Sequence, residues 1–290
     1  MKTIFIATDF SPASRNAAIY AIEWANLLQA DVVLFNGYQV PLSLPESYIL
    51  IKPEEVKQTA LTYLQEEANA LKSRMLTSIS IKAEEGSSPE LIIAEASKYP
   101  QPLIVLGMKQ EGKWIRNWFG DMVSGLARKS IFPILIVPEI AGFVSLNKIA
   151  IGIENDFETN LQSLKTLKQI GMAFHSHVNL VRVLSFQAPA SNELTSRSSH
   201  LLHSLEPLEA QYYFPRSEDT TTGLNDFVSE SGAELLCVLP KQHSLLERIF
   251  IRSETRKLIF HSHVPLLLLP DITAEKKQQP TRSAYEQISS

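Results

Sequence analysis

Pro133-Ile134-Leu135-Ile136-Val137-Pro138 and Pro265-Leu266-Leu267-Leu268-Leu269-Pro270 are two apolar runs of the same length, each enclosed by prolines. They lie 132 positions apart, from Pro133 to Pro265. Proline at the ends of an otherwise continuous apolar run fits a buried strand, because proline cannot donate a hydrogen bond in the middle of a sheet. Such matching ends indicate that the chain carries one α/β unit twice.

The first half reads as short apolar runs separated by longer stretches with helical periodicity, the pattern of βαβ units. We expect strands at 4–8, 32–38, 79–83, 103–106 and 134–137. We expect helices at 13–28, 53–75, 89–98 and 120–129. Several of these helices begin with Ser or Pro, which are favoured at helix N-termini.

The second half repeats the order of the first. Its expected strands are 149–153, 178–184, 210–214, 235–239 and 266–269, and its expected helices are 157–174, 191–205, 220–230 and 251–261. The units are therefore predicted at 1–140 and 147–270. Residues 271–290 are polar and are expected to form a mobile tail.

Parallel strands with helices on both faces form a doubly wound sheet. The predicted fold class is α/β, with two tandem Rossmann-like open sheets of five parallel strands each. In such sheets ligands bind at the carboxyl ends of the strands, where the strand order reverses. The segments after the first and fourth strands are therefore the first places to look for a site.

Composition narrows the function classes. The net charge of -4 leaves no basic excess for a nucleic-acid backbone, so we expect no nucleic-acid partner. No apolar run approaches the roughly 20 residues of a membrane-spanning helix, so we expect no membrane partner. The single cysteine, Cys237, lies in an apolar run and suits a reducing compartment. A cytoplasmic location is the expectation.

The segment after the fourth expected strand contains Gly107, Gly112 and Gly120, and it leads into a helix. Glycines at such a place let backbone N–H groups approach an anion closely. Together with a first strand that ends at Asp9 and the terminal proline-flanked strand, this segment resembles the universal stress protein family. The resemblance covers nearly the whole chain, and its duplicated layout is similar to the tandem members of that family.

Members of that family that bind ATP carry glycine, two residues, glycine, nine residues, and glycine followed by Ser or Thr. Gly107 and Gly120 keep the outer spacing, since 120 minus 107 is 13. Gln110 stands where the middle glycine belongs, and Asp121 replaces the hydroxyl residue. A carboxylate near a phosphate costs on the order of 1 to 4 kcal/mol at about 4 Å. Binding of ATP or another adenine nucleotide is therefore expected to be weak or absent.

The resemblance implies which residues would contact a nucleotide in the first half. Asp9 would accept a hydrogen bond from the nucleoside, although it can equally serve the following helix as its cap, a role for which Ser11 competes. Gly37 would offer only its backbone. The complete set of implied cofactor contacts is Asp9, Gly37, Gly107, Met108, Gln110, Gly120 and Asp121.

The second half is expected to have no such site. Leu239 and Pro240 stand at the counterparts of Gly107 and Met108, and Arg252 stands at the counterpart of Gly120. Without glycines the backbone loses its close approach to a phosphate. We therefore expect an adenine nucleotide in the first half only, with no metal site in either half.

Three functions remain open from the sequence. The first is a stress-response binding or regulatory protein that holds a nucleotide weakly, and the second is a structural or interaction protein of the same fold without a nucleotide. The third is a slow ATP hydrolase, which lacks a recognisable general base or catalytic residue, so we expect no enzyme. The resemblance also implies that the halves pair through their last strands as a pseudo-dimer, and a homodimer of two chains is a further expectation.

Overall fold

The structure is a computed structural model, which describes residues 1–41, 52–109, 118–153, 161–188, 196–239 and 264–270. The strands of the first half are β1 (Thr3–Ala7), β2 (Asp31–Tyr38), β3 (Ile79–Glu85), β4 (Pro102–Met108) and β5 (Ile134–Pro138). Its helices are α1 (Pro12–Leu28), α2 (Pro53–Leu71), the 3-10 turn η1 (Lys72–Arg74), α3 (Pro89–Ala96) and α4 (Trp118–Lys129).

The second half has the same order of elements. Its strands are β6 (Lys148–Gly152), β7 (His177–Val181), β8 (Ala210–Tyr213), β9 (Leu235–Val238) and β10 (Leu266–Leu268). Its described helices are α5 (Leu161–Phe174), α6 (Ser196–Leu205) and α7 (Thr220–Ser231). The helix predicted at 251–261 and the tail at 271–290 lie outside the described residues.

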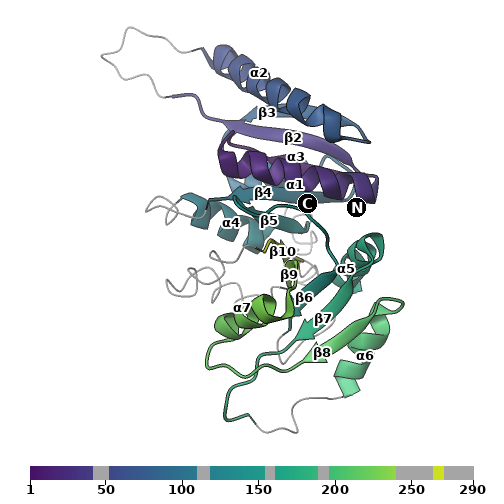
Figure 1. The fold of residues 1–290 in the computed structure, drawn as a ribbon. Coiled ribbons are helices and arrows are strands. Elements are labelled where there is room, and N and C mark those ends of the chain that lie inside the picture. Colours follow the sequence, from purple (N-terminus) through teal and green to yellow (C-terminus); the bar gives the residue numbers. More distant parts are fainter. Residues whose placement is uncertain (42–51, 110–117, 154–160, 189–195, 240–263, 271–290) are drawn as a thin grey trace, which may run out of the picture.

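All these strands form one ten-stranded sheet with the order β3-β2-β1-β4-β5-β10-β9-β6-β7-β8 (Figure 1). Within each half every neighbouring pair is parallel. Only β5 and β10 are antiparallel, with Leu135 opposite Leu267. The predicted fold class is confirmed, and the two halves join through their last strands. The unit boundaries stay a prediction.

Many predicted elements differ from the observed ones at their ends: the helix expected at 53–75 ends at Leu71, and the strand expected at 79–83 extends to Glu85. The strand expected at 178–184 ends at Val181, because Pro215 follows β8 and has no N–H to continue the ladder; a single bridge joins Leu184 to Arg216 beyond it. The helix expected from Gly120 begins at Trp118 instead. Glycine is unfavourable inside a helix, which is why the helix was not expected before Gly120, yet Gly120 lies inside the first turn of α4.

Helices cover both faces of the sheet, and each face has its own apolar layer. One layer combines side chains of α1, α2, α5 and α6 with the sheet. The other combines α3, α4 and α7 with the opposite face. Helix α1 shows how the sequence directs this arrangement: Ser11 caps its first turn by accepting the N–H of Ser14, and Ala17, Ala21 and Trp24 lie buried on one side of it.

Aromatic side chains join the halves on the face covered by α1 and α5. The ring of Trp24 in α1 lies 5.0 Å from that of Phe174 in α5. Phe143, in the segment between β5 and β6, lies 5.2 Å from Tyr20 and 6.0 Å from Phe174. Contacts of this kind stabilise beyond the area that they bury. The halves therefore share a core as well as a sheet.

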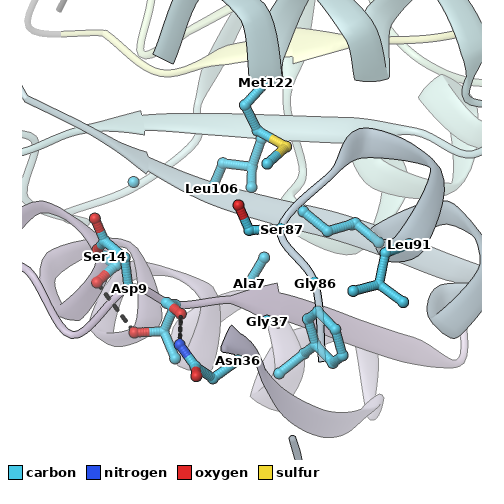
Figure 2. Close-up of a pocket in the computed structure, with 14 residues that line it drawn as sticks. Ala7, Asp9, Ser14, Asn36, Gly37, Gly86, Ser87, Leu91, Leu106 and Met122 are labelled. Atoms are coloured by element: carbon cyan, nitrogen blue, oxygen red, sulfur yellow. Dashed lines mark hydrogen bonds between the residues drawn. The ribbon is translucent and has the colours of Figure 1, made fainter. Parts of the chain in front are cut away.

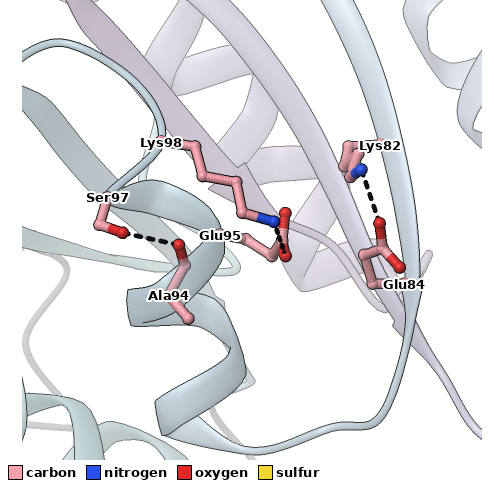
Figure 3. Close-up of polar contacts among 6 residues, drawn as sticks. All are labelled: Lys82, Glu84, Ala94, Glu95, Ser97 and Lys98. Atoms are coloured by element: carbon pink, nitrogen blue, oxygen red, sulfur yellow. Dashed lines mark hydrogen bonds and ion pairs between the residues drawn. The ribbon is translucent and has the colours of Figure 1, made fainter.

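Charged groups mark the outer edge strand β3. Lys82 and Glu84 alternate along it and form an ion pair of 2.6 Å (Figure 3). Beside them, Glu95 of α3 is buried and pairs with Lys98 at the end of that helix. Charges on an edge strand oppose pairing with another chain. None of the helices among the described residues is long and apolar enough to cross a membrane.

Replacement of Trp24 by Ala should destabilise the whole chain, because the side chain of Trp24 is fully buried and joins α1 to Phe174 of α5. Loss of a buried aromatic side chain costs about 3–5 kcal/mol. Urea unfolding followed by circular dichroism measures the loss. Leu27→Ala on the same helix is the control, since Leu27 is 51% exposed and its loss should change the free energy of unfolding by less than about 0.5 kcal/mol. Equal effects of the two substitutions would contradict the shared core.

Candidate functional site

The strand order reverses between β1 and β4, which places the switch point of the first half there. The chain leaves β1 into α1 on one face of the sheet, while α4, the next described helix after β4, covers the other face. The carboxyl ends of β1 and β4 therefore have helices diverging from them. A crevice at this point is the usual ligand site of doubly wound sheets.

A cavity occupies this crevice and encloses about 580 Å³ of empty space, with the open solvent at its mouth included (Figure 2). Its apolar lining is Ala7, Phe35, Leu91, Ile92, Leu106 and Met122. Its polar lining is Thr8, Asp9, Ser14, Asn36 and Ser87, and the glycines Gly37, Gly86 and Gly107 complete it. The wall is thus mainly apolar, with hydrogen-bonding groups at one side, as in sites for flat organic ligands.

The turn from β1 into α1 supplies the polar side of the cavity. Thr8 Oγ1 lies 3.0 Å from Ser14 Oγ, and its N–H donates to the carbonyl of Phe35 at 2.8 Å. Phe10 follows with a positive φ of 63°, a conformation that turns the chain sharply. These contacts fix the hydroxyls of Thr8 and Ser14 at the ends of β1 and β2.

Asp9 lies exposed at the mouth of the cavity, and its Oδ1 accepts the N–H of Ser11 at 3.0 Å. Burial raises the pKa of this carboxyl, but hydrogen bonds from Ser11 and Ser14 and the charge of Lys109 outweigh burial and hold the pKa below its ordinary value. The cap of α1 is Ser11, not Asp9. Asp9 therefore presents a negative charge to the mouth at neutral pH.

Glu67, on α2, approaches the same turn from the side. Its Oε2 lies 3.2 Å from Thr8 Oγ1, while its Oε1 is buried without a hydrogen-bond partner. Burial raises the pKa of Glu67, and the charge of Asp9 adds to this effect, against the hydrogen bond from Thr8 and the charge of Arg15. The two carboxyls near the cavity are thus shifted in opposite directions.

Two predicted glycines, Gly37 and Gly107, lie at the cavity, but the packing of the chain also requires them. A Cβ on Gly107 would lie 2.2 Å from the carbonyl oxygen of Ala13, at the start of α1. A Cβ on Gly37 would lie 2.3 Å from the carbonyl oxygen of Gly86. No real Cβ contact is so short, so the fold needs glycine at both places whether or not a ligand is present.

The other predicted contacts are placed less directly. Met108 is buried in the layer under α3 and α4 and does not line the cavity. Gly120 and Asp121 lie in the first turn of α4, of which the structure describes the backbone only. Gln110 lies outside the described residues. Of the predicted set, the cavity brings together Asp9, Gly37 and Gly107.

Several lining residues were missed by sequence reasoning. Asn36 is buried and donates to the carbonyl of Thr8 at 2.8 Å (Figure 2). The sequence could have indicated Asn36, because it is the one amide side chain in the apolar run 32–38. Ser87 and Met122 reach the cavity from the segment before α3 and from α4, and no local pattern marks them.

The second half has bulky side chains at the matching positions. Ile153 N–H donates to Val181 as Thr8 N–H donates to Phe35, and Ser217 N–H donates to Leu184 as Gly86 N–H donates to Tyr38. In this register the counterparts are Ile153 for Thr8, Val183 for Gly37 and Leu239 for Gly107.

The side chain of Val183 packs against α7, where Gly223 stands at the counterpart of Ile92, counting from the helix caps Ser88 and Asp219. A Cβ on Gly223 would lie 2.7 Å from Val183 Cγ1. Val183 and Gly223 therefore take the places that Gly37 and Ile92 have in the first half.

Metal ligands do not gather in the described part of the chain. No group of three or more His, Cys, Asp or Glu residues there could hold a metal ion. His177 is paired with Glu209 instead, with Nδ1 to Oε2 at 2.8 Å.

The sequence and the fold can be compared with those of known proteins. Residues 1–138 match the model of the universal stress protein family. The first half of the chain belongs to the universal stress protein family. No curated protein matches the chain.

Solved structures extend the likeness to both halves. A universal stress protein from Archaeoglobus fulgidus superposes with a TM-score of 0.69 at 14% identity, over 92% of this chain and 96% of that one. A protein of unknown function from Pseudomonas aeruginosa gives 0.56 at 13% identity, over 93% and 92%. A universal stress protein from Archaeoglobus fulgidus in complex with dAMP covers 43% of this chain and 98% of that one, with 12% identity and a TM-score of 0.30. For the first two structures, at 14% and 13% identity, the likeness concerns the fold.

The packing role of Gly107 predicts that Gly107→Ala destabilises the protein in the absence of any ligand. The added Cβ would push the start of α1 away from β4, at a cost of about 1–3 kcal/mol. Gly142→Ala is the matched control, because nothing lies within 4 Å of a Cβ there. Chemical denaturation measures the free energy of unfolding of both variants. An unchanged value for Gly107→Ala would refute the packing role.

Glu67→Gln should remove a pH dependence of stability. The pKa of Glu67 is raised in the folded state above its ordinary 4.5, so the native state is favoured when Glu67 is protonated. The free energy of unfolding therefore falls as the pH rises from 4.5 through the folded-state pKa. Urea unfolding at several pH values from about 4 to about 7 should show a flatter dependence for Glu67→Gln.

The matched control for this substitution is Glu66→Gln, at an exposed position of the same helix. It should keep the dependence of the unsubstituted protein. Asp9→Asn should act with the opposite sign, because the pKa of Asp9 is lowered and its contribution is present above 3.8 and lost as the pH falls. A Glu67→Gln curve parallel to that of the unsubstituted protein would contradict the raised pKa.

Proposed function

We propose that the chain is a regulatory protein of the stress response that holds one adenine nucleotide weakly, in the cavity at the switch point of its first half. The observation that carries the proposal is the open, mainly apolar cavity between β1 and β4. It lies in the half that matches the universal stress protein family. Both the place in the fold and the chemistry of the wall suit a nucleoside.

The base and the ribose would use different parts of this cavity. Phe35, Leu106 and Met122 offer apolar surface on which a planar base can pack. The charged carboxylate of Asp9 at the mouth can accept hydrogen bonds from ribose hydroxyls. Asn36 is fixed by its bond to Thr8 and offers an amide at the floor.

The phosphate end is the weak part of the site. No Lys or Arg is among the described residues that line the cavity, and Lys109 stands just beyond β4. The sequence has Gln110 and Asp121 at the two positions where ATP-binding members of the family have glycine and a hydroxyl residue. Each added phosphate brings more negative charge toward Asp9 and Asp121. We therefore expect AMP to bind at least as tightly as ATP.

The second half is proposed to bind no nucleotide. Val183 and Leu239 replace the two glycines, and Ile153 replaces the hydroxyl of Thr8. We also propose that the chain is no enzyme: Thr8 Oγ1 lies 3.2 Å from Glu67 Oε2, but the described residues that line the cavity include no His, Lys or Cys that could act with this pair. Slow hydrolysis of ATP ranks last for this reason.

A structural or interaction protein without a nucleotide is the second candidate. It is favoured by one observation, that the packing of α1 on β4 and the turn at Gly86 require Gly107 and Gly37 without any ligand. The two candidates differ in whether the cavity is occupied.

Isothermal titration of nucleotide-stripped protein should detect one site per chain for AMP, with a dissociation constant above about 1 µM and no tighter binding of ATP. Ala7→Val adds two methyl groups to the lining of the cavity and should weaken AMP binding at least about tenfold. Ala210→Val, on β8 of the second half, is the matched control and should leave binding unchanged.

The possible outcomes separate the candidates. Submicromolar binding of ATP at two sites per chain would overturn the proposal. Absence of binding for AMP, ADP, ATP and adenosine would leave the structural or interaction protein. Equal weakening by Ala7→Val and Ala210→Val would show that the binding site lies elsewhere.

A further inference from the structure

A groove lies at the junction of the two halves, on the edge of the sheet opposite the nucleotide cavity of the first half. It encloses about 1240 Å³, open solvent included. Met1, Gln101 and Pro133 line it from the amino ends of β1, β4 and β5. Lys165 and Gln169 of α5 form the other wall, and Pro270, just after β10, lies at one end.

The two halves are related by an approximate two-fold axis, because β5 and β10 are antiparallel neighbours with matching surroundings. The helix after the first strand of each half holds the end of that half's last strand. Asn16 Nδ2 of α1 donates to the carbonyl of Pro138 at 2.9 Å, and Ser163 Oγ of α5 donates to the carbonyl of Pro270 at 2.7 Å. The chain therefore leaves β5 and β10 in equivalent surroundings.

After β5 the chain fills the position that is the symmetry mate of the groove. The segment 139–147 runs along the amino ends of the second-half strands to β6. Asn16 Nδ2 also donates to the carbonyl of Ala141 at 2.9 Å, and Ala141 and Leu146 are buried. At the far end the N–H groups of Asn147 and Lys148 donate to Glu234. On that side of the junction, residues 139–147 therefore take the place that the groove has on the other side.

The sequence after β10 begins like the sequence after β5. Pro138-Glu139-Ile140-Ala141-Gly142 is answered by Pro270-Asp271-Ile272-Thr273-Ala274, with the same offset of 132 that relates the two strands. Both segments have an acidic residue, Ile and two small residues in the same order. The duplication thus continues past the last strand, into residues that lie outside the described part of the chain.

We propose that residues 271–279 lie in the junction groove as residues 139–147 lie in its symmetry mate. The segment would pass from the end of β10 across the amino ends of β5, β4 and β1, and so tie the second half to the first. Three adjacent strands span about 10 Å, and a segment of this length reaches up to about 30 Å, so the reach is sufficient. The expectation of a mobile tail then applies only beyond residue 279.

Charge and polarity favour this occupant over an apolar peptide. The groove has Gln101, Thr166 and Gln169 as hydrogen-bonding groups and Lys165 as an exposed cation. The first part of the segment has Asp271 and Glu275 as anions, and Lys276, Lys277, Gln278 and Gln279 follow as polar residues. Its tether to Pro270 gives it a high effective concentration at the groove, which a partner in solution lacks.

Amide hydrogen exchange on the full chain and on a chain that ends at Pro270 tests the proposal. Without the segment, exchange should become at least about tenfold faster at residues 101–104, 131–134 and 163–169, and it should stay unchanged at 31–38. A synthetic peptide of residues 271–290 should restore the protection, whereas a peptide of scrambled sequence should not. Equal exchange in the two chains would overturn the proposal.

A point variant of the full chain keeps the test valid if the shortened chain unfolds. Gln169→Trp places a large side chain in the groove and should speed exchange at residues 101–104 and 131–134 to a similar degree. Gln65→Trp, at an exposed position of α2 away from the groove, is the matched control and should leave exchange unchanged. Protection that disappears on dilution of the full chain would assign the groove to a second copy instead, and would refute this occupant.

Discussion

The antiparallel pairing of β5 with β10 is the constraint on which the rest of the molecule depends. Each strand is a short, fully buried apolar run, and either one alone would be an exposed edge open to other chains. Pairing them removes both edges and leaves β3 and β8 at the outside, where β3 is marked by the Lys82–Glu84 ion pair. The same pairing sets α1 against α5 and allows Trp24 and Phe174 to share a core.

Once the pairing fixes the scaffold, the two halves can diverge at their strand ends without loss of the fold. Glycine in the first half meets backbone from its own half, at Ala13 for Gly107 and at Gly86 for Gly37. In the second half Val183 is accommodated because α7 has Gly223 opposite it. The change at one strand end is thus compensated on the neighbouring helix, which is a local exchange of volume of the kind that cores tolerate.

Sequence alone could predict the strands, because buried parallel strands are continuous apolar runs, and the repeat, because both final strands are enclosed by prolines. It placed Asp9, Gly37 and Gly107 at the correct strand ends. It could not predict why the glycines are needed, since the atoms that exclude a Cβ come from Ala13 and Gly86, which are distant in sequence. Met122 was missed because it reaches the cavity from α4, which is distant in sequence from β1 and β2. The early end of β7 depended on Pro215, which follows the neighbouring strand β8.

The glycines are therefore weak support for a ligand, and the open cavity is the stronger argument. A crevice at the switch point of a doubly wound sheet is the usual place for a ligand. The second half has a bulkier side chain at the matching strand end, with Val183 against Gly223, whereas a Cβ on Gly37 would meet the backbone of Gly86. The first half keeps Gly37 and leaves the space between Phe35, Leu106 and Met122 open. The packing against Ala13 and Gly86 accounts for the glycines, and the proposed binding role accounts for the open crevice beside them.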